Sequence, residues 1–258
     1  MHFHPRTLFA LLGTALMACG GPRPAAPVVE LPAPPDSVAT PYAEISDGAW
    51  LGDGRWAVVA PLDVTVGLVD PAGGKLSPLG GRAASKELRN PSTAFVAADT
   101  LYIGDWGLRR VSVWTPAGRL VRAIPSVAAL RGALPQARDA AGHFYLELSP
   151  RPGPDGSGNR DSAAVVRADP GLQRLDTVAR LAPLDMAEVA GDAGRRFERR
   201  VFSGNDLWGV LPDGSVWVAR VYDNRVDWRD PEGRWTRGEP LPDRVLEITR
   251  YDRELFLR

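Results

Sequence analysis

The chain has 258 residues, 44% of them hydrophobic, and equal numbers of acidic and basic side chains, 31 of each. This length and composition suit a globular protein of one large domain or two small ones. The balanced charge argues against nucleic-acid binding, which needs a basic surface. A single cysteine excludes an intrachain disulfide, and with only three histidines it also excludes a zinc site built from Cys and His ligands.

The first residues have the pattern of a secretory leader. Arg6 is followed by an apolar run, Leu8–Met17, which is too short to cross a bilayer. Leu16-Met17-Ala18-Cys19 resembles the lipobox of bacterial lipoproteins. The resemblance implies that residues 1–18 are removed and that Cys19 becomes a lipid-modified N-terminus. A buried free cysteine after an ordinary signal peptide is the alternative.

The resemblance also implies in which membrane the lipoprotein is located. Gly20 follows the cysteine, where Gram-negative lipoproteins retained in the inner membrane usually have Asp, so the outer membrane is favoured over the inner one. Residues 19–41 contain seven prolines, which predicts an extended, semi-rigid tether. We therefore expect a lipid anchor, a spacer and a folded domain over residues 42–258.

Two stretches of the folded part repeat each other without a gap. Residues 98–119 match residues 213–234 at an offset of 115 positions, with Leu101-Tyr102-Ile103 on Val216-Trp217-Val218. Each copy alternates apolar and polar residues between turn residues and ends at a Pro-x-Gly-Arg hairpin, which indicates a β-meander. Meanders repeated every 40–50 residues are typical of β-propellers, in which each meander is a four-stranded blade.

Four such units are legible. The first lies around residues 50–76, the second covers 92–124, the third starts near Leu134 and the fourth covers 206–240. The third contains an insertion, Pro150–Ser162, between two of its strands, which would emerge on one face of the propeller. The spacing of residues 183–203 predicts one or two short amphipathic helices, residues 245–251 predict a further strand, and Asp252–Arg258 the start of a helix.

The units resemble the six-bladed propellers of the NHL and TolB-like kind. Asp223-Asn224-Arg225-Val226 matches the Asn-Arg-Val stretch of an NHL repeat, and Arg109-Arg110-Val111 matches it less closely, with Arg in place of Asn. The resemblance implies six blades, whereas the residues after the tether suffice for fewer. We expect that two blades are degenerate or missing, as in a truncated reading frame, or that the ring is small.

Few residues offer catalytic chemistry. His143 is the only histidine after the leader, and a surface or turn role is favoured over that of a base. No phosphate-binding glycine motif of the Walker A or Rossmann kind is present. Four carboxylates, Asp63, Asp105, Glu147 and Asp223, lie at or just beyond the end of a blade strand, where they could converge on Ca²⁺. Turn carboxylates also occur because Asp hydrogen-bonds its own bend.

The sequence thus predicts an all-β propeller with a short helical insertion near 183–203, and it supports two functions. The first is a lipid-anchored binding module of the cell envelope for a protein, peptide or glycan partner, without cofactor. The alternative is a Ca²⁺-dependent propeller hydrolase or lyase that uses the four carboxylates. Calcium-dependent thermal stabilisation would separate the two.

Overall fold

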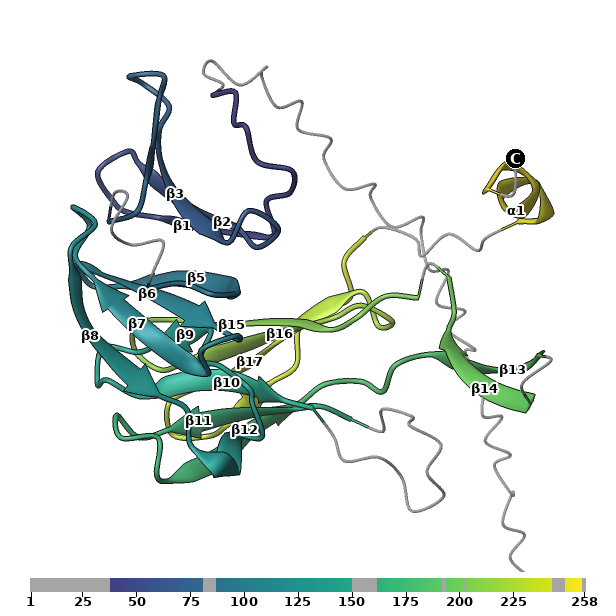
Figure 1. The fold of residues 1–258 in the computed structure, drawn as a ribbon. Coiled ribbons are helices and arrows are strands. Elements are labelled where there is room, and N and C mark those ends of the chain that lie inside the picture. Colours follow the sequence, from purple (N-terminus) through teal and green to yellow (C-terminus); the bar gives the residue numbers. More distant parts are fainter. Residues whose placement is uncertain are drawn as a thin grey trace, which may run out of the picture.

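The computed structural model describes residues 38–80, 87–149, 162–191, 194–201, 203–242 and 249–256. Its dominant feature is a set of four antiparallel four-stranded sheets, arranged as a four-bladed β-propeller (Figure 1). Strand order within each sheet follows chain order, so each sheet is a meander. The predicted all-β propeller of repeated meanders is confirmed.

Short turns join the strands of each sheet, except between β10 and β11, where the chain carries the insertion. The first sheet contains β1 (Asp47–Trp50), β2 (Trp56–Ala60), β3 (Thr65–Asp70) and β4 (Lys75–Pro78). The second contains β5 (Pro91–Ala97), β6 (Thr100–Asp105), β7 (Arg110–Trp114) and β8 (Leu120–Pro125). The third contains β9 (Ala137–Arg138), β10 (Phe144–Leu148), β11 (Ala164–Ala168) and β12 (Leu175–Arg180). The fourth contains β15 (Leu207–Val210), β16 (Val216–Arg220), β17 (Arg225–Arg229) and β18 (Trp235–Thr236). A 3₁₀ turn, η2 (Ala128–Leu130), lies between the second and third sheets.

The period-2 pattern of the strands places each sheet between two neighbours. Successive residues of a strand point to opposite faces of the sheet. On β6, Leu101 and Ile103 pack toward the first sheet, whereas Tyr102 packs toward the third. On β10, Phe144 faces the second sheet and Tyr145 the fourth. Because both faces of these sheets are buried, the residues that point to either face of β6 and β10 are apolar.

Three separate apolar cores join the four sheets in series. One core lies between the first and second sheets, one between the second and third, and one between the third and fourth. The innermost strands make the same connections, since β1 contacts β5, β5 contacts β9, and β9 contacts β15. The carboxylate of Asp47 also accepts a hydrogen bond from the Ala94 amide at 2.9 Å, which ties β1 to β5.

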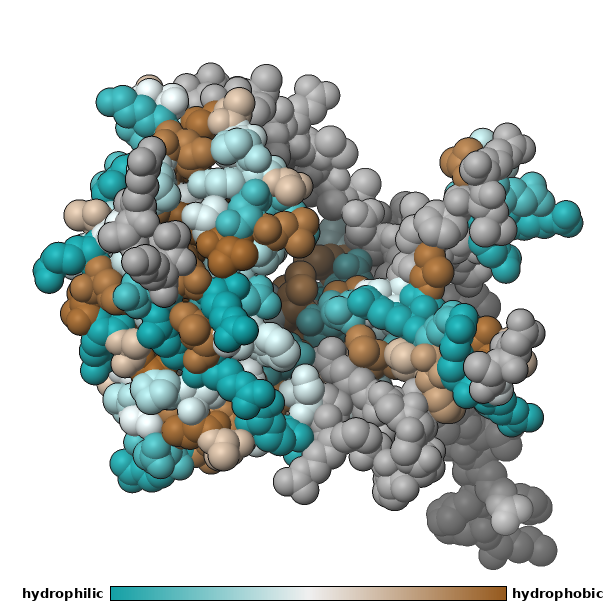
Figure 2. All heavy atoms as spheres, in the orientation of Figure 1, coloured by the Kyte–Doolittle hydropathy of each residue, from teal (hydrophilic) through white to brown (hydrophobic). Residues whose placement is uncertain are grey.

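The fourth sheet is buried mainly on one face. On β16, Val216 and Val218 are fully buried against the third sheet, while Trp217 between them is half-buried. Trp228, paired with Trp217 across the sheet, is exposed. Figure 2 shows hydrophobic and hydrophilic residues intermixed over the visible side of the sheets.

The described residues of the segment 183–203 contain no helix, so the prediction of short helices there is wrong. That segment contains β13 (Met186–Gly191) and β14 (Gly194–Arg199), which pair with each other in a hairpin. Gly191 pairs with Gly194, and the φ of Gly194 is +106°, a value that glycine adopts at little cost. Glycine on both sides of a two-residue link is a hairpin signal, and it prevails over the helical spacing of the apolar residues.

At the C-terminal end, the predicted helix is confirmed as α1 (Arg250–Phe256). The strand predicted over residues 245–251 is wrong in its last three residues, since residue 249 is in no strand and residues 250 and 251 belong to α1; residues 243–248 lie outside the described residues. Cys19 and the tether up to residue 37 also lie outside them, as does nearly all of the insertion that joins β10 to β11. No helix in the described ranges is long and apolar enough to cross a membrane.

Candidate functional site

The turns that join the second and third strands of the sheets share one face of the propeller, because every sheet is the same meander. Pro61–Val64, Trp106–Arg109 and Val221–Asn224 are three of these turns, each four residues long. Their last residues, Val64, Arg109 and Asn224, all have left-handed φ values, of 52°, 49° and 48°. Asn tolerates this region better than most residues. The Asn of the Asn-Arg-Val pattern thus fits a backbone requirement of the turn.

Asp105 holds the central turn in place. It ends β6, is completely buried, and accepts hydrogen bonds from the amides of Arg89 (2.7 Å), Asn90 (3.1 Å) and Leu108 (2.8 Å). The Trp106 amide in turn donates to the Asn90 carbonyl at 2.9 Å. The segment that leads into β5 and the turn after β6 therefore form one rigid unit.

A hollow of about 650 Å³ lies beside this unit, and we call it the arginine hollow. It is lined by Pro61 and Leu62 from the first sheet, Arg89 and Asn90 from the segment before β5, and Trp106, Gly107 and Arg109 from the central turn. Gly107 lets the stem of Arg89 lie close, because a Cβ there would be 3.0 Å from Arg89 Cγ.

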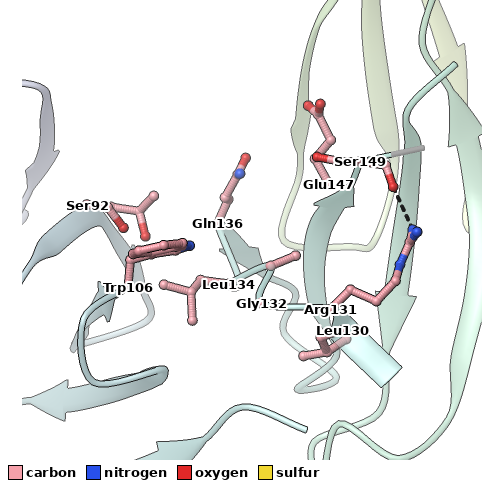
Figure 3. Close-up of a pocket in the computed structure, with 11 residues that line it drawn as sticks. Ser92, Trp106, Leu130, Arg131, Gly132, Leu134, Gln136, Glu147 and Ser149 are labelled. Atoms are coloured by element: carbon pink, nitrogen blue, oxygen red, sulfur yellow. Dashed lines mark hydrogen bonds between the residues drawn. The ribbon is translucent and has the colours of Figure 1, made fainter. Parts of the chain in front are cut away.

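A second hollow, of about 440 Å³, lies on the other side of Trp106. We call it the glutamate hollow; Trp106, Ser92, Gln136, Glu147 and Ser149 contribute to its lining, with Arg131 and apolar side chains. Figure 3 shows Trp106 and Glu147 on opposite sides of this hollow, with the Arg131 guanidinium bonded to the Ser149 carbonyl at 2.6 Å. Trp106 therefore separates two hollows, and its side chain is 61% exposed.

The arginine hollow has an unbalanced positive charge. Arg89 and Arg109 are both exposed, and within the described residues neither guanidinium forms an ion pair or a side-chain hydrogen bond. Among the described residues, no acidic side chain lines this hollow. Asp105 lies beneath it, but its oxygens are engaged by backbone amides. An anionic group in this hollow would meet two uncompensated cations.

The four carboxylates proposed for calcium have separate surroundings. Asp63 accepts a bond from the Ala43 amide at 3.0 Å, and Asp105 serves the central turn as described. Glu147 accepts a bond from the Trp208 indole at 3.3 Å, and Asp223 forms an ion pair with Arg225. In the part of the chain that the structure describes, no three His, Cys, Asp or Glu side chains form a group that could hold a metal.

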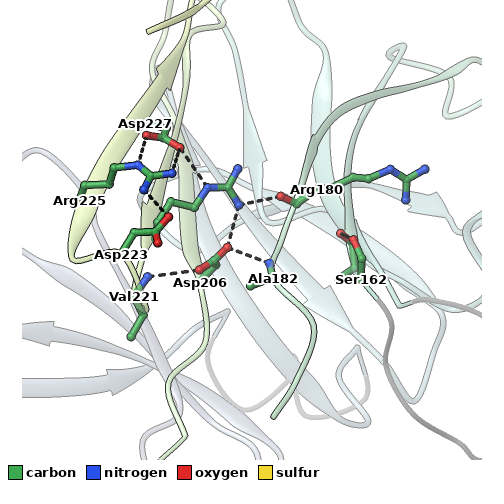
Figure 4. Close-up of polar contacts among 10 residues, drawn as sticks. Ser162, Arg180, Ala182, Asp206, Val221, Asp223, Arg225 and Asp227 are labelled. Atoms are coloured by element: carbon green, nitrogen blue, oxygen red, sulfur yellow. Dashed lines mark hydrogen bonds and ion pairs between the residues drawn. The ribbon is translucent and has the colours of Figure 1, made fainter. Parts of the chain in front are cut away.

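Asp223 belongs instead to a charged network in the fourth sheet, which surrounds a third hollow of about 350 Å³ (Figure 4). Arg220 donates to Asp206 at 2.7 Å, to Asp227 at 3.2 Å and to the Arg180 carbonyl at 2.8 Å. Arg225 contacts Asp227 at 2.8 Å, and this bond raises the pKa of Arg225. Because Arg180 ends β12, the network fastens the third sheet to the fourth, and each of its two guanidinium groups is paired with carboxylates.

His143, the histidine considered as a base, has a buried carboxylate as its partner. Its Nδ1 lies 2.9 Å from Asp139 Oδ2, and its amide donates to Asp139 Oδ1 at 2.8 Å. The Tyr145 hydroxyl donates to the same carboxylate at 2.9 Å, and the Ala140 amide reaches the Pro212 carbonyl of the fourth sheet. The geometry describes a junction between two sheets and agrees with the turn role expected for His143.

The same contacts change the acidity of these groups. Burial would raise the pKa of Asp139, but the hydrogen bonds from His143 and Tyr145 outweigh it, so the pKa is lowered. Burial and the bond to Asp139 raise the pKa of Tyr145.

Sequence reasoning missed the residues of the arginine hollow. Asp105 was singled out for its charge, whereas its neighbour Trp106 bears the exposed surface. The available signal was a Trp-Gly pair within a predicted turn: large aromatic residues are rarely needed in turns, and Gly at position 107 allows the close approach of Arg89.

Fold and site together define the class of protein: a β-propeller with two adjoining hollows on one face. No family model and no curated protein matches the chain. Among solved structures it is similar to a Bacteroides thetaiotaomicron protein of unknown function, at 12% identity and a TM-score of 0.46 over 78% of this chain and 45% of that one. It is also similar to a gluconolactonase from Xanthomonas campestris (15% identity, TM-score 0.39, 85% of this chain and 89% of that one).

A third similar structure is a streptogramin B lyase (10% identity, TM-score 0.44, 79% of this chain and 71% of that one). The chain thus spans less than half of the first of these structures and most of the other two. At this level of identity and overlap, the likenesses assign neither a ligand nor an activity to the chain.

Proposed function

We propose that the protein is a lipid-anchored binding module of the cell envelope, tethered through Cys19 and acting through the propeller face that bears Trp106. The observation that carries the binding role is the exposed indole between two hollows. Exposed Trp and Arg side chains that border concave surfaces are typical of the residues that dominate binding interfaces. No nucleic-acid role is proposed, since the net charge is zero.

The anchor is tested by the variant Cys19→Ser in the native host. We expect the wild-type protein in the outer-membrane fraction and the variant released from it, because the serine hydroxyl does not replace the thiol in lipid attachment. A variant that remains in the outer-membrane fraction would contradict the anchor, and a wild type in the inner-membrane fraction would contradict the address.

The binding face is tested with a photoreactive p-benzoylphenylalanine at position 106 of the full-length protein in living cells. We expect a discrete covalent adduct on illumination. Position 235 is the matched control, because Trp235 is also exposed but lies on the outermost strand β18 and lines none of the three hollows described. Identical adducts from both positions, or none from position 106, would contradict the proposal.

The six-bladed form and the calcium-dependent hydrolase or lyase remain expectations from the sequence. Intact mass of the purified lipoprotein tests the first, because further blades would add about 40–50 residues each. Thermal melts with and without Ca²⁺ test the second. A rise of the melting temperature with Ca²⁺ would favour the hydrolase or lyase, since a ligand that binds only the folded state stabilises it.

A further inference from the structure

The arginine hollow combines features that point to one class of partner. Two arginines without acidic partners line the same hollow as an exposed indole, and Leu62, which lines it from the first sheet, is 68% exposed. A leucine and a tryptophan exposed in one hollow leave apolar area in water, and burial of that area would be favourable by roughly 25 cal/mol per Å². We infer that this hollow receives a polypeptide segment that carries an acidic side chain next to an apolar one.

The charges carry the acidic half of the inference. Other exposed arginines are of both kinds: Arg195 pairs with Glu188 in one hairpin, whereas the side chains of Arg119 and Arg122 form no ion pair within the described residues. Arg89 and Arg109 line the same hollow from two different segments, and none of the described residues that line it is acidic. A carboxylate placed between two guanidinium groups forms charge-assisted hydrogen bonds, which are the strong ones.

The apolar side chains carry the other half. Leu62 lines the hollow from the first sheet and Trp106 from the second, so an apolar side chain of the partner can contact both while its acidic neighbour meets the arginines. Protein interfaces are enriched in Trp and Arg at their centres. A saccharide would use the indole and the arginines but would leave the exposed leucine without an apolar partner.

The site is also pre-organised, which lowers the entropy that binding costs. Asp105 fixes the amides on both sides of the hollow, and the Ser126 amide holds the Arg109 carbonyl at 2.8 Å. Arg109 itself has a left-handed backbone conformation, with which the turn ends before the chain enters β7. The backbone of the hollow therefore needs no rearrangement when a partner docks.

This inference rests on the proposed binding function and specifies its partner. The test is a selection of random twelve-residue peptides from a display library against the purified full-length protein in detergent. We expect the selected peptides to be enriched in Asp or Glu beside an apolar residue. We further expect R89E/R109E to weaken their binding about tenfold or more, with a stronger effect at low salt.

The matched control is R119E/R122E, which makes the same change of charge at two exposed arginines outside the hollows. It should leave peptide affinity unchanged. Thermal melts confirm that both variants fold, and R89Q/R109Q replaces the charge reversal if that variant melts early.

Other outcomes overturn the inference. Selection of no peptides, selection without acidic enrichment, or equal binding to R89E/R109E would each do so. Peptides that depend on Trp106 but not on the arginines would leave the binding function standing and remove the acidic partner. Arginine-dependent binding of acidic saccharides, with no peptides selected, would assign a different partner class to the same hollow.

Discussion

At the residue scale, the last residue of three turns shows where the fold imposes a left-handed backbone on a side chain that does not favour it. Val64, Arg109 and Asn224 occupy equivalent places in three turns and share the same φ. Only Asn tolerates it readily, and a β-branched residue there is an outlier. Val64 therefore holds a conformation that its side chain disfavours.

The variant Val64→Asn should be more stable than the wild type by about 1 kcal/mol, because a left-handed conformation costs most L-residues roughly 1–2 kcal/mol. Chemical denaturation measures the difference. Val64→Ala is the control, and it should change little. If alanine stabilises as much as asparagine, the gain comes from removing an exposed side chain and not from the backbone.

Asp139 gives a pH-dependent prediction. Its pKa is lowered in the folded state, so its carboxylate contributes stability above the unfolded pKa of about 3.9, and this contribution is lost as the pH falls through the folded pKa. Asp139→Asn should therefore lower the melting temperature at neutral pH, with a difference from wild type that shrinks below about pH 4.

The control for this experiment is Tyr145→Phe, which removes one hydrogen bond to Asp139 but keeps the titrating carboxylate. A difference between Asp139→Asn and wild type that stays constant down to the lowest pH would contradict the role of the charge.

At the scale of elements, the connections between strands decide where the hollows form. The link from Asp105 to the amides of Arg89 and Leu108 joins the start of one sheet to a turn within it. Without this link, the backbone segments that carry Arg89 and Arg109 would no longer be held at a fixed position relative to each other. The sheets therefore place the turns next to one another, and the buried carboxylate of Asp105 fixes the backbone around the arginine hollow.

Asp105→Ala should destabilise the protein by about 3 kcal/mol, since it leaves three amides without their acceptor. Asp105→Asn, which keeps one carbonyl oxygen, should cost less. Urea denaturation gives both values. A loss within about 0.5 kcal/mol for alanine would mean that the amides find water or other acceptors instead.

The sequence specified the strands well because each carries its own period-2 pattern and turn residues. The failure at residues 183–203 has a physical cause: in the hairpin β13–β14, β14 is exposed along its whole length, so its apolar spacing carries no information about a core. The hollows were also out of reach. They depend on contacts between residues 62, 89 and 106, which come from different segments and have no shared pattern in the chain.

At the scale of the whole molecule, the serial arrangement of the cores makes stability a sum over neighbours, as in repeat proteins. The second and third sheets have a core on each face, whereas the first and fourth have one each. Native-state hydrogen exchange should therefore be slowest for the amides of β6 and β10 and faster for those of β16. Uniform protection across the four sheets would show a single cooperative unit instead.

This order has a consequence for the binding face. The turn that bears Trp106 extends from the doubly covered second sheet, so the fourth sheet can open and close without disturbing it. Transient loss of the last blade would expose β15 and β16 to proteases or chaperones while the arginine hollow keeps its shape. Cleavage in the fourth sheet would then release a fragment that retains the arginine hollow, and with it the proposed binding function.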